Sequence, residues 1–296
     1  MQLKVLLQTI RPSFLILTPG CIFLGLATSL AAQASLNLFM ILLVFIGAIS
    51  AHISVNAINE YHDFKSGLDF KTGKTPFSGG SGALPEHPEM AGAVWATGLV
   101  SLMVTVVTGV YFILELGIDI LPVGLLGVVL ILTYTRWLNR FPLLCLVAPG
   151  LGFGILMVTG THLILAGAPS QLAWLVSLVP FFLINNLLLL NQYPDIKADS
   201  NVGRKTFPIA FGTKRSSQVY AVFLTATYAL ILLLMVKNLI PGLAIVALAP
   251  MLLSLFALSG AIKYAENLAN YPRYLAANVA AAIFTPLLLG VSIAFG

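Results

Sequence analysis

Charged side chains are scarce in this chain. Asp, Glu, Lys and Arg make up only 8% of the 296 residues, whereas a typical soluble protein has about 25%. Ten acidic and 15 basic side chains cannot cover the surface of a soluble protein of this size, and 59% of the residues are hydrophobic. The composition also excludes a disordered chain, which needs low hydrophobicity, and a coiled coil, which needs charged flanking positions. We therefore expect an integral membrane protein.

Cysteine is even scarcer. Cys21 and Cys145 both lie in apolar segments, so we expect them to be packing residues and not part of a disulfide framework. The net charge of +5 would favour nucleic-acid binding only in a soluble protein. We expect no nucleic-acid partner, and we look instead at where the basic residues lie along the chain.

Long apolar runs separated by short polar breaks occupy most of the chain. We interpret nine of them as membrane spans: 14–32, 38–58, 92–114, 118–135, 143–166, 172–192, 219–236, 239–259 and 274–294. Each is close to the ~20 residues that a helix needs to cross the hydrocarbon layer, whereas a β-barrel would show alternating segments of about ten residues. The sequence predicts an all-α, polytopic fold: one membrane-embedded domain over 1–296 with about nine transmembrane helices, of which 118–135 is the shortest.

The basic residues lie almost entirely on one side of these spans. If the N-terminus is inside, 14 of the 15 Lys and Arg residues are cytoplasmic, and Lys237 alone is outside. Such a bias is typical of the cytoplasmic loops of membrane proteins. We predict a cytoplasmic N-terminus.

Polar residues gather where the second span ends. On a helix, five of them share one face: His52, Asn56, Asn59, Glu60 and Asp63. Polar groups at membrane depth are costly unless they face a cavity or a partner, so we expect this stripe to point into the bundle. Gly67 is expected to end the helix, and Asp69 to fold back beside Asp63.

A second acidic segment follows the sixth span. Asp195 and Asp199 are i,i+4 neighbours on a predicted short helix that Pro194 could start. Both acidic segments emerge on the predicted cytoplasmic side, and both lead into long loops, 59–91 and 193–218. Long loops in a compact protein usually carry function.

Carboxylates gathered in this way repel one another unless a cation neutralises them. Oxygen ligands favour Mg²⁺, which typically binds one or two carboxylates together with substrate phosphates. Basic residues follow each acidic segment: Lys65, Lys71 and Lys74, then Lys197, Arg204 and Lys205. We interpret this combination as a diphosphate site. For Lys71, Lys74, Lys214 and Arg215 we prefer the alternative, that they are solvated loop charges.

Two spaced motifs summarise these segments: Asn59-Glu60-x-x-Asp63-x-x-x-Gly67-x-Asp69 and Asp195-x-x-x-Asp199. Together they resemble the Asp-rich motifs of the UbiA superfamily of intramembrane prenyltransferases, and the resemblance extends to Arg11-Pro12 and to the segment 203–206. Much of the superfamily has Asn-Asp-x-x-Asp-x-x-x-Asp. The variant here, with Glu60 and Gly67, resembles the menaquinone-pathway members that prenylate 1,4-dihydroxy-2-naphthoate.

The resemblance implies a nine-helix enzyme that uses Mg²⁺ to join a polyprenyl diphosphate to an aromatic acceptor and releases its product into membrane lipid. The implied metal ligands are Asn59, Asp63, Asp69, Asp195 and Asp199. The implied substrate-binding residues are Asn56, Asn59, Lys65, Arg136, Asn191, Lys197, Arg204 and Lys205. The catalytic residues we expect are Asp63, Asp195, Tyr134 and Arg140. Arginine would stabilise the departing diphosphate, and Tyr134, with Trp137, would shield the allylic cation.

Other functions fit parts of the pattern. A superfamily member could take 4-hydroxybenzoate, homogentisate, haem or a glycerol phosphate lipid as acceptor. A cation-coupled transporter would also have many helices and buried acids, but its charges would lie near the bilayer midplane. Here the acids cluster on one side, which favours an enzyme. The glycine-rich segment Ser78–Gly82 could bind phosphate or form a flexible lid.

Overall fold

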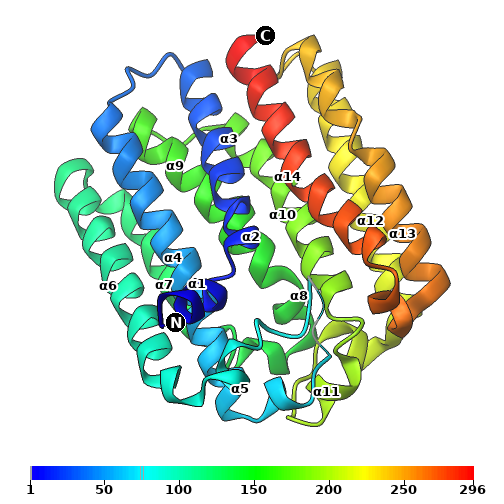
Figure 1. The fold of residues 1–296 in the computed structure, drawn as a ribbon. Helices are drawn as coiled ribbons and strands as arrows, with labels where there is room; N and C mark the ends of the chain where they lie inside the picture. Colours follow the sequence, from blue (N-terminus) through cyan, green and yellow to red (C-terminus); the bar gives the residue numbers. More distant parts are fainter. Residues whose placement is uncertain (1, 74, 76) are drawn as a thin grey trace.

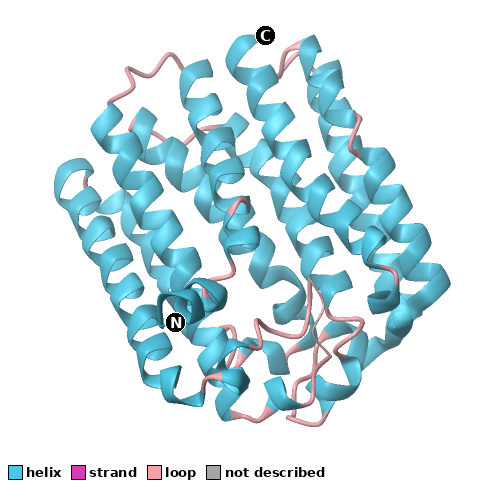
Figure 2. Cartoon of the chain, viewed as in Figure 1, coloured by secondary structure: helices cyan, strands magenta, loops and turns pink. Residues whose placement is uncertain are grey.

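The computed structural model describes residues 2–73, 75 and 77–296, and every regular element in these ranges is a helix (Figures 1 and 2). Lys74 lies outside the described residues. The α-helices are α1 (Gln2–Thr9), α2 (Pro12–Leu15), α3 (Leu17–Ala31), α4 (Leu38–Lys65), α5 (Ala83–Glu86), α6 (Ala91–Leu116), α7 (Leu121–Thr133), α8 (Pro142–Gly150), α9 (Met157–Ala166), α10 (Gln171–Asn191), α11 (Ile196–Ser200), α12 (Phe207–Val236), α13 (Met251–Tyr264) and α14 (Pro272–Phe295). Short 3₁₀ turns cover Leu68–Phe70, Pro88–Met90, Ile118–Ile120, Leu138–Arg140, Gly242–Leu248 and Ala265–Asn270, and a π-helical turn, Leu151–Leu156, joins α8 to α9.

Within the described residues, eight helical segments are long and apolar enough to cross a membrane. A ninth, Ile118–Thr133, is apolar but shorter. The two ends of the chain lie at opposite ends of the bundle, as an odd number of passes requires (Figure 1). The predicted all-α bundle is confirmed, with eight full-length spans and one short one.

The helices pack in two groups: the first contains α4 and α6, and the second contains α3, α9, α10, α12 and α14. α4 packs mainly on α6, whereas α3 packs on α9 and α14, and α10 packs on α12 and α14. The second group is also joined by hydrogen bonds at membrane depth. The Tyr220 hydroxyl on α12 donates to Asn278 Oδ1 on α14 at 2.9 Å, and Asn278 Nδ2 donates to the backbone oxygen of Asn186 on α10 at 3.1 Å. Such bonds between helices stabilise a bundle that has no hydrophobic effect to drive its association.

The two predicted long loops are partly helical, which corrects their lengths. α4 continues past the apolar run to Lys65, and Gly67, at φ 76°, then ends it as predicted. The second acidic segment forms α11 with Asp195 at its N-cap, and α12 already begins at Phe207. The apolar run shows where hydrocarbon ends, but the helix continues as long as its backbone bonds are formed. The acidic segments are therefore held on helix ends.

Candidate active site

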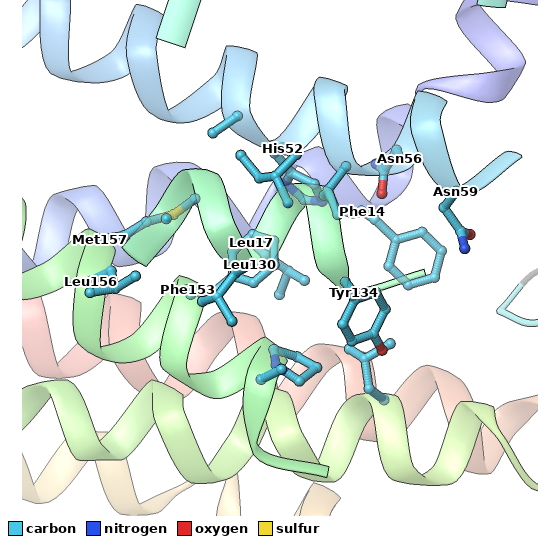
Figure 3. A pocket seen from close by; sticks show the side chains of 18 of the residues that line it. Phe14, Leu17, His52, Asn56, Asn59, Leu130, Tyr134, Phe153, Leu156 and Met157 are labelled. Carbon is cyan, nitrogen blue, oxygen red and sulfur yellow. The ribbon is translucent and has the colours of Figure 1, made fainter. Parts of the chain in front are cut away.

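A cavity of about 390 Å³ runs between α4, α7 and the α8–α9 segment (Figure 3). On α4 its lining extends from Val44 to Asp63, which corresponds to about 28 Å along the helix axis. Asn59 and Tyr134 lie toward one end of the view in Figure 3, and Leu156 and Met157 toward the other. The cavity therefore has a polar end, called here the acidic end, and a long apolar part, called here the channel.

Four aspartates line the acidic end: Asp63, Asp69, Asp195 and Asp199. They come from the end of α4, the Leu68–Phe70 turn, the N-cap of α11 and α11 itself. Arg204, in the connection between α11 and α12, is ion-paired with Asp63 and donates from Nη1 to Asp199 Oδ1 at 2.9 Å. One guanidinium thus joins the two acidic segments.

Positive charge is in short supply at the acidic end. Burial, together with the neighbouring Glu60 and Asp63 carboxylates, raises the pKa of Asp69 to about 8. Burial, together with Asp199, raises the pKa of Asp195 to about 7, and Arg204 opposes both increases. A group in this position favours its neutral form unless a cation is added. The cluster therefore favours the binding of additional positive charge.

The donor set at the acidic end fits a hard cation such as Mg²⁺. Among the described residues, no three His, Cys, Asp or Glu side chains form a preassembled metal site, and Arg204 pairs with two of the four aspartates. Three buried oxygens that line the cavity have no hydrogen-bond partner: Asp69 Oδ2, Asn191 Oδ1 and Thr206 Oγ1. Mg²⁺ typically takes few protein carboxylates and completes its shell with phosphate and water oxygens. The site thus has oxygen donors to offer and needs a ligand to complete it.

The structure brings nine of the predicted site residues to this cavity: Asn56, Asn59, Asp63, Asp69, Tyr134, Asn191, Asp195, Asp199 and Arg204. Five others have exposed side chains and do not line it: Lys65, Arg136, Arg140, Lys197 and Lys205. Lys65 and Lys197 each follow an aspartate by two positions on a helix, which turns the side chain about 200° away from it. Trp137 is 54% exposed, with Arg136 over its ring. The roles expected for these exposed side chains stay predictions.

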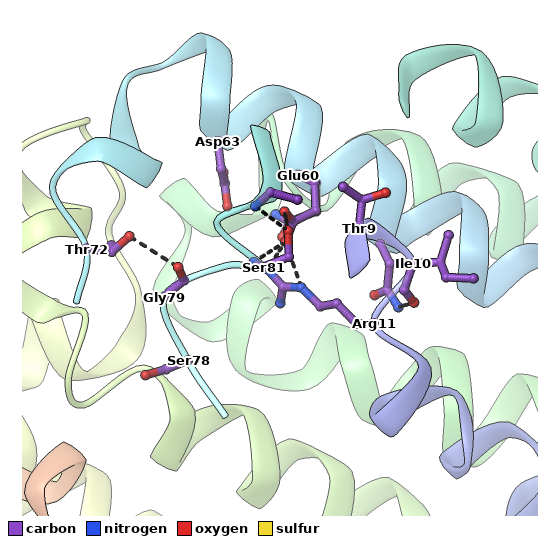
Figure 4. Close-up of polar contacts among 12 residues, drawn as sticks. Thr9, Ile10, Arg11, Glu60, Asp63, Thr72, Ser78, Gly79 and Ser81 are labelled. Atoms are coloured by element: carbon purple, nitrogen blue, oxygen red, sulfur yellow. Dashed lines mark hydrogen bonds and ion pairs between the residues drawn. The ribbon is translucent and has the colours of Figure 1, made fainter. Parts of the chain in front are cut away.

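Glu60 points into the bundle as predicted, but it meets partners there and does not line the cavity. Its fully buried carboxylate accepts hydrogen bonds from Arg11 Nε at 2.8 Å, from the Ser81 backbone N–H at 2.9 Å and from the Ser81 hydroxyl at 2.6 Å (Figure 4). The sequence pattern could not show which partners Glu60 has. Arg11 has a left-handed backbone, φ 51°, and itself lines the cavity. Its only signal in the sequence was the Arg11-Pro12 resemblance.

The glycine-rich segment Ser78–Gly82, called here the strap, forms hydrogen bonds with both acidic segments. The Gly79 N–H donates to Asp195 Oδ2 at 3.1 Å, while Ser81 is held by Glu60. A Cβ on Gly80 would lie 2.8 Å from Asp69 Oδ1, and φ at Gly80 is 72°. Only glycine therefore lets the strap pass so close to Asp69. The strap connects one acidic segment to the other.

Small side chains line the channel beyond the polar end. Gly47, Ala48 and Ala51 on α4 and Gly124 and Gly127 on α7 all line this cavity. At the boundary, the buried His52 ring hydrogen-bonds through Nδ1 to the Thr18 hydroxyl at 2.9 Å and packs on Phe153. The channel suits a long apolar group attached to a charged head.

This combination defines a class of protein, a membrane-embedded enzyme whose cavity suits an amphiphilic substrate with an anionic head. Residues 19–285 match the UbiA prenyltransferase family, and the chain belongs to that family. The chain is 26% identical over 231 residues to the 1,4-dihydroxy-2-naphthoate octaprenyltransferase of Bacillus subtilis (strain 168), a match covering 76% of this chain and 71% of the relative.

Solved structures show the same fold. The apo structure of a UbiA homolog from Aeropyrum pernix K1 superimposes with a TM-score of 0.73 at 18% identity, covering 95% of this chain and 97% of that one. A UbiA homolog from Archaeoglobus fulgidus, bound to DMAPP and Mg²⁺, gives a TM-score of 0.64 at 16% identity and covers 95% and 98% of the two chains.

Removing the Glu60 charge tests the attachment of the strap. We expect Glu60→Gln to lower the free energy of unfolding by about 3 kcal/mol, because it removes one partner of a buried ion pair. This value is the low end for such a change, since the Arg11 side chain is 25% exposed. The measurement is thermal unfolding of the detergent-purified protein. Glu89→Gln is the matched control, since Glu89 is 62% exposed and pairs with His87 at the surface. Equal unfolding temperatures for the two variants would contradict the structural role of Glu60.

Proposed function

We propose that this protein transfers a polyprenyl group from a polyprenyl diphosphate to 1,4-dihydroxy-2-naphthoate, with Mg²⁺, in menaquinone biosynthesis. The observation that carries the proposal is the direct opening of the acidic end, with its four aspartates and Arg204, into an apolar channel. Such a cavity matches the two halves of a polyprenyl diphosphate. Two of the relatives support it: the B. subtilis protein acts on 1,4-dihydroxy-2-naphthoate, and the A. fulgidus protein binds DMAPP and Mg²⁺.

The residues of the acidic end would share the work of binding the head group. Asn59, Asp63, Asp69, Asp195 and Asp199 offer the oxygens for Mg²⁺, which when bound would neutralise charge that develops on the departing diphosphate. Arg204 would donate to the same diphosphate oxygens, and arginine suits such bidentate contacts. The unpartnered Asn191 and Thr206 oxygens also line this space. The head group is thereby fixed at one end of the cavity.

Ionisation of the donor would take place where the acidic end meets the channel. The bond between the first prenyl carbon and the diphosphate oxygen breaks, and its electron pair leaves with the diphosphate. The half-buried Tyr134 lines this boundary, where its ring face would stabilise the allylic cation. The apolar walls exclude water, which would otherwise capture the cation. The π electrons of the acceptor ring then form a bond to the first prenyl carbon. The ring regains aromaticity when the attacked carbon loses its proton or, where that carbon bears the carboxylate, carbon dioxide, and the electron pair of the broken bond returns to the ring.

The same proposal sets the orientation in the membrane. α1, α5 and α11 lie at one end of the bundle with the acidic segments (Figure 1). Fourteen of the 15 basic residues belong to the predicted cytoplasmic side, so the acidic end would face the cytoplasm of a bacterial inner membrane. A polar donor head and a polar acceptor would both be available there, and the product could leave into lipid.

An acceptor comparison tests the reaction. The purified protein, supplied with Mg²⁺ and a polyprenyl diphosphate, should use 1,4-dihydroxy-2-naphthoate with a kcat/KM at least about tenfold above that for 4-hydroxybenzoate or homogentisate, a difference of about 1.4 kcal/mol. Product is measured by chromatography and mass spectrometry. Faster use of either monocyclic acceptor would overturn the assignment of the acceptor, and no product with any acceptor would overturn the reaction.

Removing single charges tests the metal ligands. Asp63→Asn and Asp195→Asn should each reduce kcat by about 10²-fold or more, because charge stabilisation of the leaving group is lost, and should raise the Mg²⁺ concentration for half-maximal activity. Asp119→Asn is the matched control, since Asp119 is exposed and outside the cavity lining. Full activity of both cavity variants would exclude these aspartates from the site.

The channel predicts a preference for donor length. Gly127 lines it about 10 Å from Tyr134 along α7, which is roughly two extended prenyl units at about 5 Å each. A Cβ at Gly127 meets no atom within 4 Å, so a larger side chain can project into open space. Gly127→Phe should lower kcat/KM for a donor of eight units by about tenfold and leave that for a two-unit donor nearly unchanged.

Gly92→Phe provides the control for this change. Gly92 is also free of neighbours within 4 Å, but it lies on α6 outside the cavity lining. Both donors should therefore be used by this variant as by the native protein. An equal loss for long and short donors in Gly127→Phe would show that the tail does not pass this point.

A further inference from the structure

Arg204 holds the carboxylates that the proposed function assigns to Mg²⁺. Its side chain is only 16% exposed, and it pairs with Asp63 at the end of α4 and with Asp199 on α11. The two aspartates belong to segments far apart in the sequence, so this one guanidinium joins both halves of the acidic end. A carboxylate oxygen engaged by an arginine N–H has less lone-pair density to offer a metal. Arg204 and Mg²⁺ therefore compete for the same oxygens.

Within the described part of the cavity lining, no other cation is free to take over that pairing. Among the described residues that line it, only Arg11 and Arg204 carry a full positive charge. Arg11 is already bound through Nε and Nη2 to the buried Glu60 carboxylate. The acidic end thus has four aspartates and one arginine available to them, and Arg204 has to serve either the carboxylates or an anionic ligand.

The backbone around Arg204 is anchored, whereas its side chain reaches into the cavity. The Arg204 N–H donates to the backbone oxygen of Asp199 at 3.1 Å, and the Lys205 N–H donates to that of Asn139 at 2.8 Å. These bonds fix the turn between α11 and α12. A change of partner at Arg204 would consequently be a side-chain rotation, with no rearrangement of the helices.

We propose that Arg204 is an exchangeable clasp: it pairs with Asp63 and Asp199 until a diphosphate takes its guanidinium, and the two released carboxylates then bind Mg²⁺. This inference rests on the proposed function, because it assumes that these carboxylates hold the metal. Its consequence is that diphosphate and Mg²⁺ each strengthen the binding of the other, since such coupling is reciprocal. A diphosphate is a suitable exchange partner because its oxygens can accept from both Nη groups, which in this structure donate to Asp199 and Asp63 separately.

The clasp predicts that loss of the Arg204 guanidinium changes the affinities for the two ligands in opposite directions. Without the Arg204 guanidinium, Mg²⁺ alone should bind more tightly, whereas the diphosphate should bind more weakly. A permanent structural ion pair predicts weaker binding of both, because its loss would disorganise the site. A simple field effect of the Arg204 charge predicts tighter Mg²⁺ binding only when the charge is removed. Arg204→Lys separates these cases, because lysine keeps the charge but cannot engage both carboxylates in the bidentate manner of arginine.

The experiment measures binding to the full-length purified protein by calorimetry. The probes are Mg²⁺ alone and geranyl S-thiolodiphosphate, an unreactive donor analogue, with corrections for their complex in solution. In the native protein, the analogue should lower the Kd of Mg²⁺ by about tenfold or more. In both Arg204→Gln and Arg204→Lys, the Kd of Mg²⁺ alone should fall about threefold or more, and in Arg204→Gln the Kd of the analogue should rise about tenfold. Arg215→Gln, the same charge change at an exposed residue of α12 outside the cavity lining, should alter neither.

Three other outcomes would overturn either the clasp or the proposed function. Unchanged or weaker Mg²⁺ binding in Arg204→Lys overturns the clasp. Independent binding of Mg²⁺ and the analogue by the native protein also overturns it, and this measurement does not depend on any variant folding. A native protein that binds neither ligand overturns the proposed function itself, so the two failures are distinguishable.

Discussion

The shortage of positive charge around the four aspartates of the cavity, as seen in the described residues, is the constraint on which the rest of the structure depends. Bringing Asp63, Asp69, Asp195 and Asp199 to one cavity is unfavourable, because burial and mutual repulsion both oppose their ionisation. The ion pairs from Arg204 offset part of this cost. The remaining deficit makes the acidic end a cation-binding region, and it explains why a chain with so few charges concentrates them here.

The ion pair of Glu60 and Arg11, next to the acidic end, has a structural role. Their ion pair is neutral overall, although the Glu60 carboxylate still raises the pKa of Asp69 and Arg11 opposes this increase. The pair attaches the segment before α2 and the strap to the end of α4, and the strap reaches on to Asp195. The two acidic segments are therefore linked twice, by Arg204 from one side and by the strap from the other. Arginine serves as a structural partner in one case and as a ligand-facing group in the other.

Apolar length and polar periodicity were enough to predict the bundle and much of the cavity. Runs of about 20 apolar residues predicted the spans, and the 3.6-residue spacing of Asn56, Asn59 and Asp63 predicted the face of α4 that lines the cavity. Glu60 lies on the same face by that spacing, but its orientation is decided by Arg11 and Ser81, which come from segments remote in sequence. Lys65 and Lys197 were chosen by proximity along the chain, and helix geometry turns both outward.

The short helix α7 has a consequence for the surrounding lipid. The segment Ile118–Thr133 has 16 residues and an axial length of about 24 Å, less than the ~30 Å hydrocarbon thickness of a typical bilayer. The bilayer next to this wall of the channel has to thin, or its headgroups have to dip inward, to match the helix. Hydrophobic mismatch is thus built into the side of the protein where Gly124 and Gly127 line the channel without a side chain. A change in bilayer thickness would therefore act directly on α7, which forms a wall of the channel.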